Sequence, residues 1–110
     1  DMAKGYWAGQ VFEIRNQARF DRYVEKAMAI FAEEAAKGTG NFVPLAVGEP
    51  KGIIQEGPTG AALFGGIVAF NSLEEAVAGH EDPRYQAALA ELGEDPEETV
   101  VRTLAIFEGA

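Results

Sequence analysis

The stretch AFNSLEEAVAGHEDPRYQAAL, residues 69–89, contains two helix-start signals directly after an extended segment. Ser72 and Glu75 have the spacing of a capping box, in which each side chain bonds the free backbone amide of the other residue. Asp82 before Pro83 is a second signal, because Asp caps helices well and Pro suits the first helical position. The stretch therefore predicts a helix that begins at Ser72 and a second, short helix that begins after Asp82.

Extended segments flank these two helices. Residues 61–70, AALFGGIVAF, are apolar throughout, which predicts a central strand that is buried on both faces. Within this strand, Gly65 and Gly66 indicate a bulge or a close approach of two backbones. Residues 99–109, TVVRTLAIFEG, predict the last strand. Its two faces carry, respectively, Val101, Thr103, Ala105 and Phe107, and Val100, Arg102, Leu104 and Ile106.

Two earlier segments are also predicted as strands. Residues 4–14, KGYWAGQVFEI, place Trp7 on one face and Ile14 on the other, so that both faces carry large side chains. Such a strand is typically covered on two sides. Residues 41–58, NFVPLAVGEPKGIIQEGP, predict a strand, a turn and a second short extended piece. Because Pro44 lacks an amide hydrogen, this strand is expected at an edge of the sheet or with a bulge at Pro44.

Residues 16–38 predict a long helix between these strands. Asn16 can cap its first amides, and Gly38 can end it in a left-handed conformation. Its apolar side chains recur at helical spacing, at Phe20, Val24, Ala27 and Phe31, and Tyr23 and Ile30 widen this stripe. The order strand, helix, strand, strand, helix, strand predicts an α+β fold of the ferredoxin-like β-α-β-β-α-β type, with an antiparallel sheet and the helices on one face.

The composition indicates one domain over residues 1–110, with its core at about residues 4–109. Nine Lys and Arg against eighteen Asp and Glu give a formal charge of −9. This charge disfavours nucleic acid and anionic membranes as partners, because phosphate groups need a basic patch. The chain has no Cys and no apolar run as long as a membrane span, so the cytoplasm is the expected location.

A dimer is expected because the predicted helices cover only one face of the sheet. The other face must still hold aromatic side chains, and monomers rarely leave such a surface in water. A homodimer in which two sheet faces meet through identical patches solves this problem. A monomer that tolerates exposed aromatic side chains, or a dimer that pairs strands edge to edge, remains an alternative.

Several segments resemble the family numbered 1330 among the domains of unknown function (DUF1330). The most specific are KGYW at residues 4–7 and DPRYQAA at residues 82–88, and RFDRYVEKA, NFVPLAVG, VAFNSLEEAVA and LAIFEG also match. The resemblance implies a ferredoxin-like domain that forms a dimeric α/β barrel, and it implies no established activity. The chain departs from the family's usual pattern at Gly79 and His80, where an aromatic pair is common.

His80 is the chain's only histidine, and histidine is the side chain that commonly titrates near neutral pH. It is therefore the candidate for acid or base catalysis. The alternative is a structural residue near the end of the helix that begins at Ser72, bonded to carbonyl groups or to Glu81. Catalysis also requires a cavity and a partner group, so the catalytic residues remain unknown from sequence.

Three further residues are candidates for ligand binding together with His80. Trp7 could line a pocket between helices and sheet or pack in the core. The hydroxyl of Tyr85 could serve a ligand or bond a structural carbonyl. Arg102 could anchor a carboxylate ligand or pair across the sheet with Glu13.

No metal site and no cofactor are expected. A single histidine and no cysteine leave no typical ligand set for zinc or iron, and the glycine-rich GPTGAALFGG lacks the lysine of a phosphate-binding loop. Three functions stay open. They are a homodimer that binds a small, mostly apolar molecule between sheet and helices, a cofactor-independent oxygenase or isomerase of the dimeric-barrel kind, and a structural or interaction dimer without a pocket.

Overall fold

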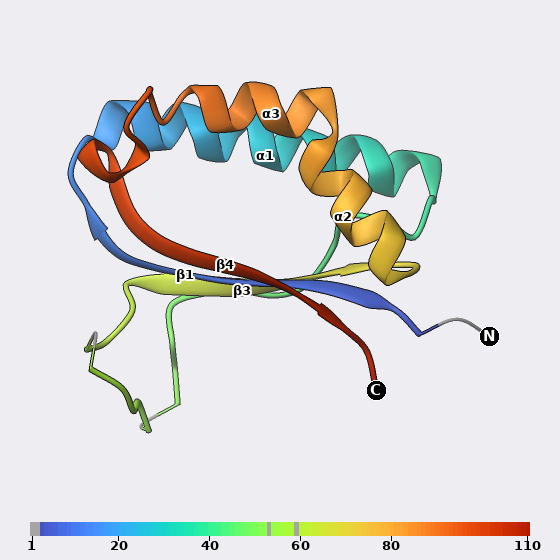
Figure 1. Ribbon diagram of the computed structural model, residues 1–110, viewed down its shortest axis with the longest axis horizontal. Helices are drawn as coiled ribbons and strands as arrows, with labels where there is room; N and C mark the ends of the chain where they lie inside the picture. The colour runs from blue at the N-terminus through green and yellow to red at the C-terminus, as the bar shows by residue number, and fades with distance from the viewer. Residues whose placement is uncertain (1–2, 53, 59) are drawn as a thin grey trace.

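The computed structural model describes residues 3–52, 54–58 and 60–110. A four-stranded antiparallel sheet forms one layer, with the strand order β2-β3-β1-β4. The helices form a second layer on one face of this sheet (Figure 1). The elements are β1 Gly5–Ile14, α1 Gln17–Lys37, β2 Val43–Gly48, β3 Phe64–Phe70, α2 Leu73–Glu81, α3 Pro83–Ala90, the 3₁₀ turn η1 Pro96–Glu98 and β4 Val100–Glu108. The ferredoxin-like α+β prediction is confirmed.

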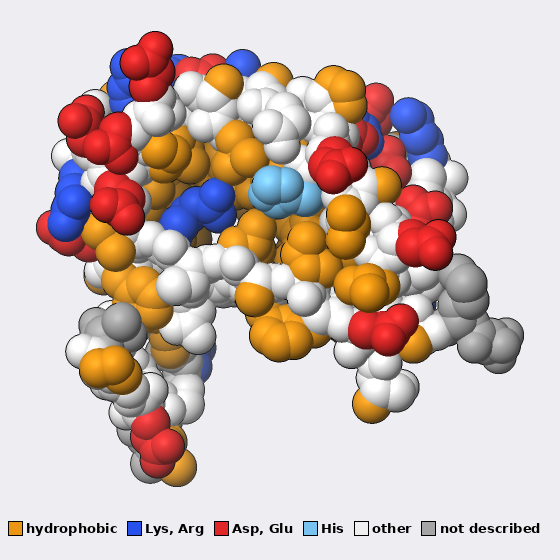
Figure 2. Space-filling view, viewed as in Figure 1, with side chains coloured by type: hydrophobic (Ala, Val, Ile, Leu, Met, Phe, Trp, Pro, Cys, Tyr) orange, Lys and Arg blue, Asp and Glu red, His pale blue; other side chains and the backbone are white. Residues whose placement is uncertain are grey.

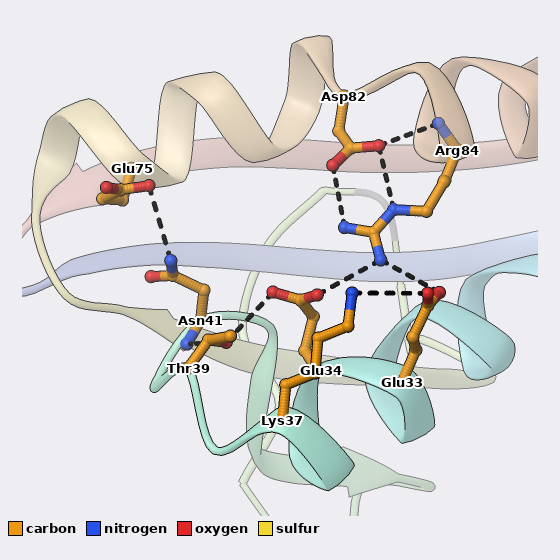
Figure 3. Close-up of polar contacts among 8 residues, drawn as sticks. All are labelled: Glu33, Glu34, Lys37, Thr39, Asn41, Glu75, Asp82 and Arg84. Atoms are coloured by element: carbon orange, nitrogen blue, oxygen red, sulfur yellow. Dashed lines mark hydrogen bonds and ion pairs between the residues drawn. The ribbon is translucent and has the colours of Figure 1, made fainter.

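The predicted helix ends agree with the structure, except for one half of the capping box. Ser72 Oγ accepts a hydrogen bond from the Glu75 amide at 3.1 Å. The Glu75 carboxylate, however, accepts from Asn41 Nδ2 at 3.4 Å (Figure 3). It therefore does not reach back to Ser72 as predicted, because the loop before β2 offers it another donor. Gly38 ends α1 with φ of 65°, in the left-handed region.

The predicted alternation of β1 is wrong beyond Val11. The register between β1 and β4 shifts between Val11 and Glu13, which marks a β-bulge. Because of this shift, Ile14 packs into the same cluster as Val11, on the face opposite to the predicted one. β3 pairs with β1 only from Phe64, opposite Val11. The strand is therefore shorter than the predicted residues 61–70.

Two clusters of buried side chains lie between the helices and the sheet. The larger contains Trp7, Ile30, Phe42, Val68, Phe70, Ala76, Tyr85 and Ala88. The smaller contains Val11, Phe20, Leu92 and Val100. Pro44 lies in the edge strand β2, next to a register shift between Pro44 and Ala46, so both features that its missing amide predicted are present.

The opposite face of the sheet, which we call the open face, has no helix over it (Figure 1). The register places on it Tyr6, Ala8, Gln10, Glu13, Val43, Ala46, Ile67, Ala69, Val101, Thr103, Ala105 and Phe107. Ile67 is 43% exposed, so β3 is not buried on both faces within one chain, contrary to the prediction. The described residues between β2 and β3, residues 49–52, 54–58 and 60–63, which we call the arm, extend away from the helices on this side (Figure 1).

Across the described residues, no helix combines the length and apolar character needed to cross a bilayer.

Candidate functional site

A cavity of about 150 Å³ lies between α1 and the helix-facing side of the sheet. Figure 2 shows hydrophobic side chains gathered in the hollow between the helical layer and the sheet. Most of the side chains that line the cavity are apolar, including Trp7, Val11, Phe20, Val24, Ala27, Met28, Phe31, Phe64, Val68 and Leu104. The polar side chains among them include Tyr23, Tyr85 and Arg102. An apolar chamber with a few polar groups is typical of sites for small molecules.

The sheet leaves room for the cavity because two glycines face each other on it. Gly9 of β1 is paired with Gly66 of β3, and the next pair on the same face is Trp7 with Val68. Side chains at the glycine positions would point toward α1 and fill the space. A Cβ built on Gly9 would also lie only 3.2 Å from the carbonyl oxygen of Thr103. The floor of the cavity is therefore bare backbone at Gly9 and Gly66.

Two tyrosines from different helices meet at the cavity wall. The hydroxyl oxygens of Tyr23 on α1 and Tyr85 on α3 lie 2.7 Å apart, and either can be the donor. Tyr85 is 2% exposed, and its ring centroid lies 4.7 Å from that of Trp7. The hydroxyl of Tyr85 thus bonds another hydroxyl, where sequence reasoning favoured a structural carbonyl. Sequence reasoning also counted Tyr23 only as part of the apolar stripe of α1.

The environment of Tyr23 keeps its hydroxyl protonated. Burial is the largest cause that raises the pKa of Tyr23 well above its ordinary value, and the neighbouring Tyr85 raises it further. The positive charge of Arg102 opposes this shift but does not cancel it. The hydroxyl is therefore a hydrogen-bond donor at neutral pH and not a base.

Arg102 places a positive charge beside the tyrosine pair. Its Cζ lies 5.3 Å from the ring centroid of Tyr23, within the range of a cation–π contact. The alternative partner Glu13 bonds Arg15 instead, with an N–O distance of 3.1 Å. Among the described residues, no carboxylate forms an ion pair with Arg102. One of the two sequence interpretations of Arg102, pairing with Glu13, is therefore not realised.

Trp7 holds the wall of the cavity in place. Its side chain is 4% exposed, and its indole Nε1 donates a hydrogen bond to the carbonyl oxygen of Ala76 at 2.8 Å. The indole nitrogen is therefore satisfied by the fold, and the ring contributes apolar surface to the cavity. Trp7 thus belongs to the core and to the cavity at the same time.

His80 packs against two residues that line the cavity. Its ring centroid is 6.1 Å from that of Trp7 and 5.4 Å from that of Tyr85. The imidazole is not among the described groups that line the cavity. Its aromatic neighbours differ from both the carbonyl groups and the Glu81 carboxylate that sequence reasoning considered. His80 thus contacts the rings of Trp7 and Tyr85, which line the cavity, but does not itself line it.

Arg84, from the DPRYQAA segment, fastens the start of α3 to α1. Its guanidinium bonds the carboxylates of Asp82, Glu33 and Glu34 at 2.8–3.2 Å, and Figure 3 shows it pointing between them. The hydrogen bond from Arg84 is the main cause that lowers the pKa of Asp82 and that of Glu33. This cluster positions Tyr85, the next residue, against the cavity.

Within the part of the chain that the structure describes, no group of three or more His, Asp or Glu side chains is placed to hold a metal ion.

Solved structures of similar fold support the architecture. A dimeric ferredoxin-like protein of unknown function from Jannaschia sp. CCS1 matches with a TM-score of 0.64 and 18% identity, over 96% of this chain and 98% of that one. A protein of unknown function from Rhodopseudomonas palustris matches with a TM-score of 0.65 and 14% identity, over 100% and 85%. A putative antibiotic biosynthesis monooxygenase from Caulobacter crescentus CB15 matches with a TM-score of 0.62 and 12% identity, over 99% and 92%.

These identities show a shared fold and no more. No curated protein sequence matches the chain. The model of the family described as a domain of unknown function, DUF1330, matches residues 4–110, and the chain therefore belongs to the DUF1330 family.

Proposed function

We propose that this protein is a homodimer that binds one small, mostly apolar molecule in the cavity between sheet and helices. The observation that carries the proposal is the chamber itself, lined mainly by apolar side chains and holding Tyr23, Tyr85 and Arg102. Its lining includes the exposed side chains of Met28 and Val47, so the cavity opens to the surface and a ligand can enter it.

The size of the cavity limits the ligand. An engineered apolar cavity of about 150 Å³ in another protein binds benzene. The cavity here has about the same volume. The expected ligand is therefore a molecule with a single ring or a short branched chain. Larger molecules would require α1 to move away from the sheet.

The homodimer part of the proposal rests on the open face. Ile67 and Phe107 are 43% and 56% exposed there, and Glu13, beside Val101 beyond the bulge, is the one charged side chain that the register of the described strands places on this face. The arm adds exposed apolar side chains on the same side, among them Ile54. Structural neighbours of this chain include dimeric ferredoxin-like proteins. Two open faces packed together would give the dimeric α/β barrel and bury this surface.

An enzyme is the second candidate function. Two structural neighbours are described as putative antibiotic biosynthesis monooxygenases. The cavity would then hold a substrate, and the protonated Tyr23 and the Arg102 cation would stabilise negative charge that develops on it. Consumption of oxygen, or turnover of a molecule that co-purifies with the protein, would favour this candidate over simple binding.

A titration with benzamide, a neutral single-ring probe, tests the binding proposal. Trp7 is the chain's only tryptophan and lines the cavity, so its fluorescence reports occupancy directly. Ala27→Leu adds three carbons at a buried lining position of α1. Ala29→Leu makes the same change on the exposed side of that helix and is the matched control.

We expect saturable binding to the wild type and to Ala29→Leu, and its loss in Ala27→Leu. Absence of saturable binding to the wild type, or equal binding to all three proteins, would contradict the proposal. Native mass spectrometry of protein purified from cells complements the titration, since it reports both a doubled chain mass and a bound small molecule. We also propose a cytoplasmic location, which the absence of cysteine supports.

A further inference from the structure

Arg102 differs from the other arginines in having no hydrogen-bonded partner among the described residues. The side chains of the four others bond carboxylates or carbonyl groups: Arg15 with Glu13 and Glu97, Arg19 with Glu91, Arg22 with Glu91, and Arg84 with Asp82, Glu33 and Glu34. The chain has eighteen acidic residues, twice the number of its basic ones. An arginine that bonds none of the described residues is therefore notable in so acidic a chain.

The position of Arg102 directs this charge toward the cavity. Arg102 lies on the helix-facing side of β4, opposite Val11 of β1, and lines the apolar chamber. Its guanidinium rests on the face of the Tyr23 ring. Guanidinium groups are weakly hydrated and stack on aromatic rings, which suits them to the edge of an apolar site. The contact with the Tyr23 ring holds the guanidinium at the cavity. Its N–H groups donate no hydrogen bond to the described residues.

The tyrosine pair offers a second donor. Tyr23 and Tyr85 have two hydroxyl protons between them, and the hydrogen bond that joins their oxygens uses one. The pKa of Tyr23 is raised by burial, so Tyr23 keeps its proton at neutral pH. The remaining proton has no acceptor among the described residues. An acceptor group in the cavity would satisfy both this hydroxyl and the guanidinium.

We propose that the ligand is a small apolar carboxylic acid whose carboxylate pairs with Arg102 and accepts from the tyrosine pair, an inference that rests on the binding function proposed above. A carboxylate fits better than a phosphate for two reasons. The two oxygens of a carboxylate match the fork of one guanidinium. A phosphate dianion would need more positive charge than one arginine supplies, in a chain whose net charge is −9.

The test compares benzoate, benzamide and phenyl phosphate, which share a single ring and differ in the head group. Each is titrated into the wild type, Arg102→Gln and Arg102→Lys, with Trp7 fluorescence and calorimetry as readouts. Arg22→Gln is the matched control, because it removes an equal charge from an exposed position on α1. Benzamide binding to Arg102→Gln shows that the cavity of that variant is intact.

We expect the wild type and Arg22→Gln to bind benzoate at least about tenfold more tightly than benzamide, as a charge-assisted hydrogen bond implies. Arg102→Gln should abolish this preference, because it lowers the affinity for benzoate more than the affinity for benzamide, and Arg102→Lys should retain part of the preference. If benzoate and benzamide bind equally to the wild type, or if phenyl phosphate binds best, the carboxylate assignment is wrong while the cavity proposal stands. If none of the three binds, the proposed binding function itself fails.

Discussion

The hydroxyl oxygens of Tyr23 and Tyr85, 62 positions apart in the sequence, lie 2.7 Å from each other. This bond joins α1 to α3 across the wall of the cavity. The ion pairs of Arg84 hold the start of α3 against α1. Tyr85 is the next residue, so the same contact between the two helices also positions the pair of hydroxyl groups. Cavity shape and helix packing are therefore coupled through a few side chains.

Removal of one hydroxyl of the pair should lower the free energy of unfolding, and removal of the second hydroxyl should lower it by much less. Tyr23→Phe or Tyr85→Phe leaves the other hydroxyl without its partner, which typically costs about 1 kcal/mol. The double variant has no unsatisfied hydroxyl. Its loss in the free energy of unfolding should therefore be closer to the loss in either single variant than to the sum of the two losses. Urea unfolding of the four proteins gives the coupling energy. Strict additivity would show that the 2.7 Å contact does not contribute to stability.

Alkaline pH should destabilise the protein through Tyr23. Burial raises the pKa of this hydroxyl above its ordinary value of 10.0. The folded state therefore holds the proton to higher pH than the unfolded state, and the contribution is complete below pH 10 and lost as the pH rises beyond it. The free energy of unfolding, measured up to about pH 11, should fall more steeply for the wild type than for Tyr23→Phe. Parallel curves for the two proteins would contradict this account.

The helices could be predicted from the sequence because their signals are local. Ser72 caps the amide of Glu75, three residues on, and Asp82 caps that of Arg84, two residues on. No distant residue needs to be known for either contact. The same holds for Gly38, whose left-handed conformation ends α1. The order of elements then leaves few topologies open, which is why the ferredoxin-like fold followed.

A pocket between helices and sheet was expected, but its floor could not be predicted because the floor depends on register. The bare floor exists only because Gly9 is paired with Gly66, and the bulge after Val11 changes which residues follow on that face. Sequence reasoning identified Gly66 as notable but not Gly9. Tyr23 was missed as well, although one signal was available. A tyrosine within an otherwise apolar stripe needs a partner for its hydroxyl when it is buried.

Trp7 and His80 should differ sharply in their effect on stability. Trp7→Ala removes a ring that is 4% exposed and the indole bond to the Ala76 carbonyl, and we expect a loss of about 3–5 kcal/mol. His80→Ala leaves the cavity lining intact and should change stability by less than about 1 kcal/mol. Thermal and urea unfolding measure both. An equally large loss in His80→Ala would reveal a structural role that its ring contacts do not show.

Arg84→Met should weaken the link between α1 and α3. The change removes bonds to three carboxylates and leaves Glu34, which is 8% exposed, without its cation. Because the arginine side chain is itself 34% exposed, the expected loss is moderate, about 1–2 kcal/mol. Lys37→Met, which removes a more exposed partner of Glu33, is the control and should cost much less.

The pH dependence of the free energy of unfolding in acid tests the Arg84 cluster independently. The hydrogen bond from Arg84 lowers the pKa of Asp82 from its ordinary value of 3.8. A depressed pKa stabilises the fold above the unfolded value, and this contribution is lost as the pH falls below 3.8 toward the folded-state pKa. Unfolding below pH 4 should therefore be less pH-dependent in Arg84→Met than in the wild type. A steeper dependence in the variant would mean that other carboxylates dominate acid unfolding.

Charge on the open face should separate the proposed dimer. Ile67 is 43% exposed at the centre of that face, and Ile67→Glu would bury a carboxylate against apolar side chains of the second subunit. Val77 on α2 is 41% exposed in the helical layer, so Val77→Glu makes the same change at equal exposure away from the open face. Sedimentation equilibrium should show a monomer for Ile67→Glu and a dimer for the wild type and Val77→Glu.

The comparison is informative because both variants gain the same charge from a side chain of similar exposure, so a general effect of acidity would act on both. A monomeric wild type would remove the dimer from the proposal but not the cavity, which lies on the helix-facing side of the sheet and is lined within one chain. A dimer that only Val77→Glu disrupts would place the interface on the helices. That result would leave the apolar open face without an occupant, against the expectation that such surfaces are covered.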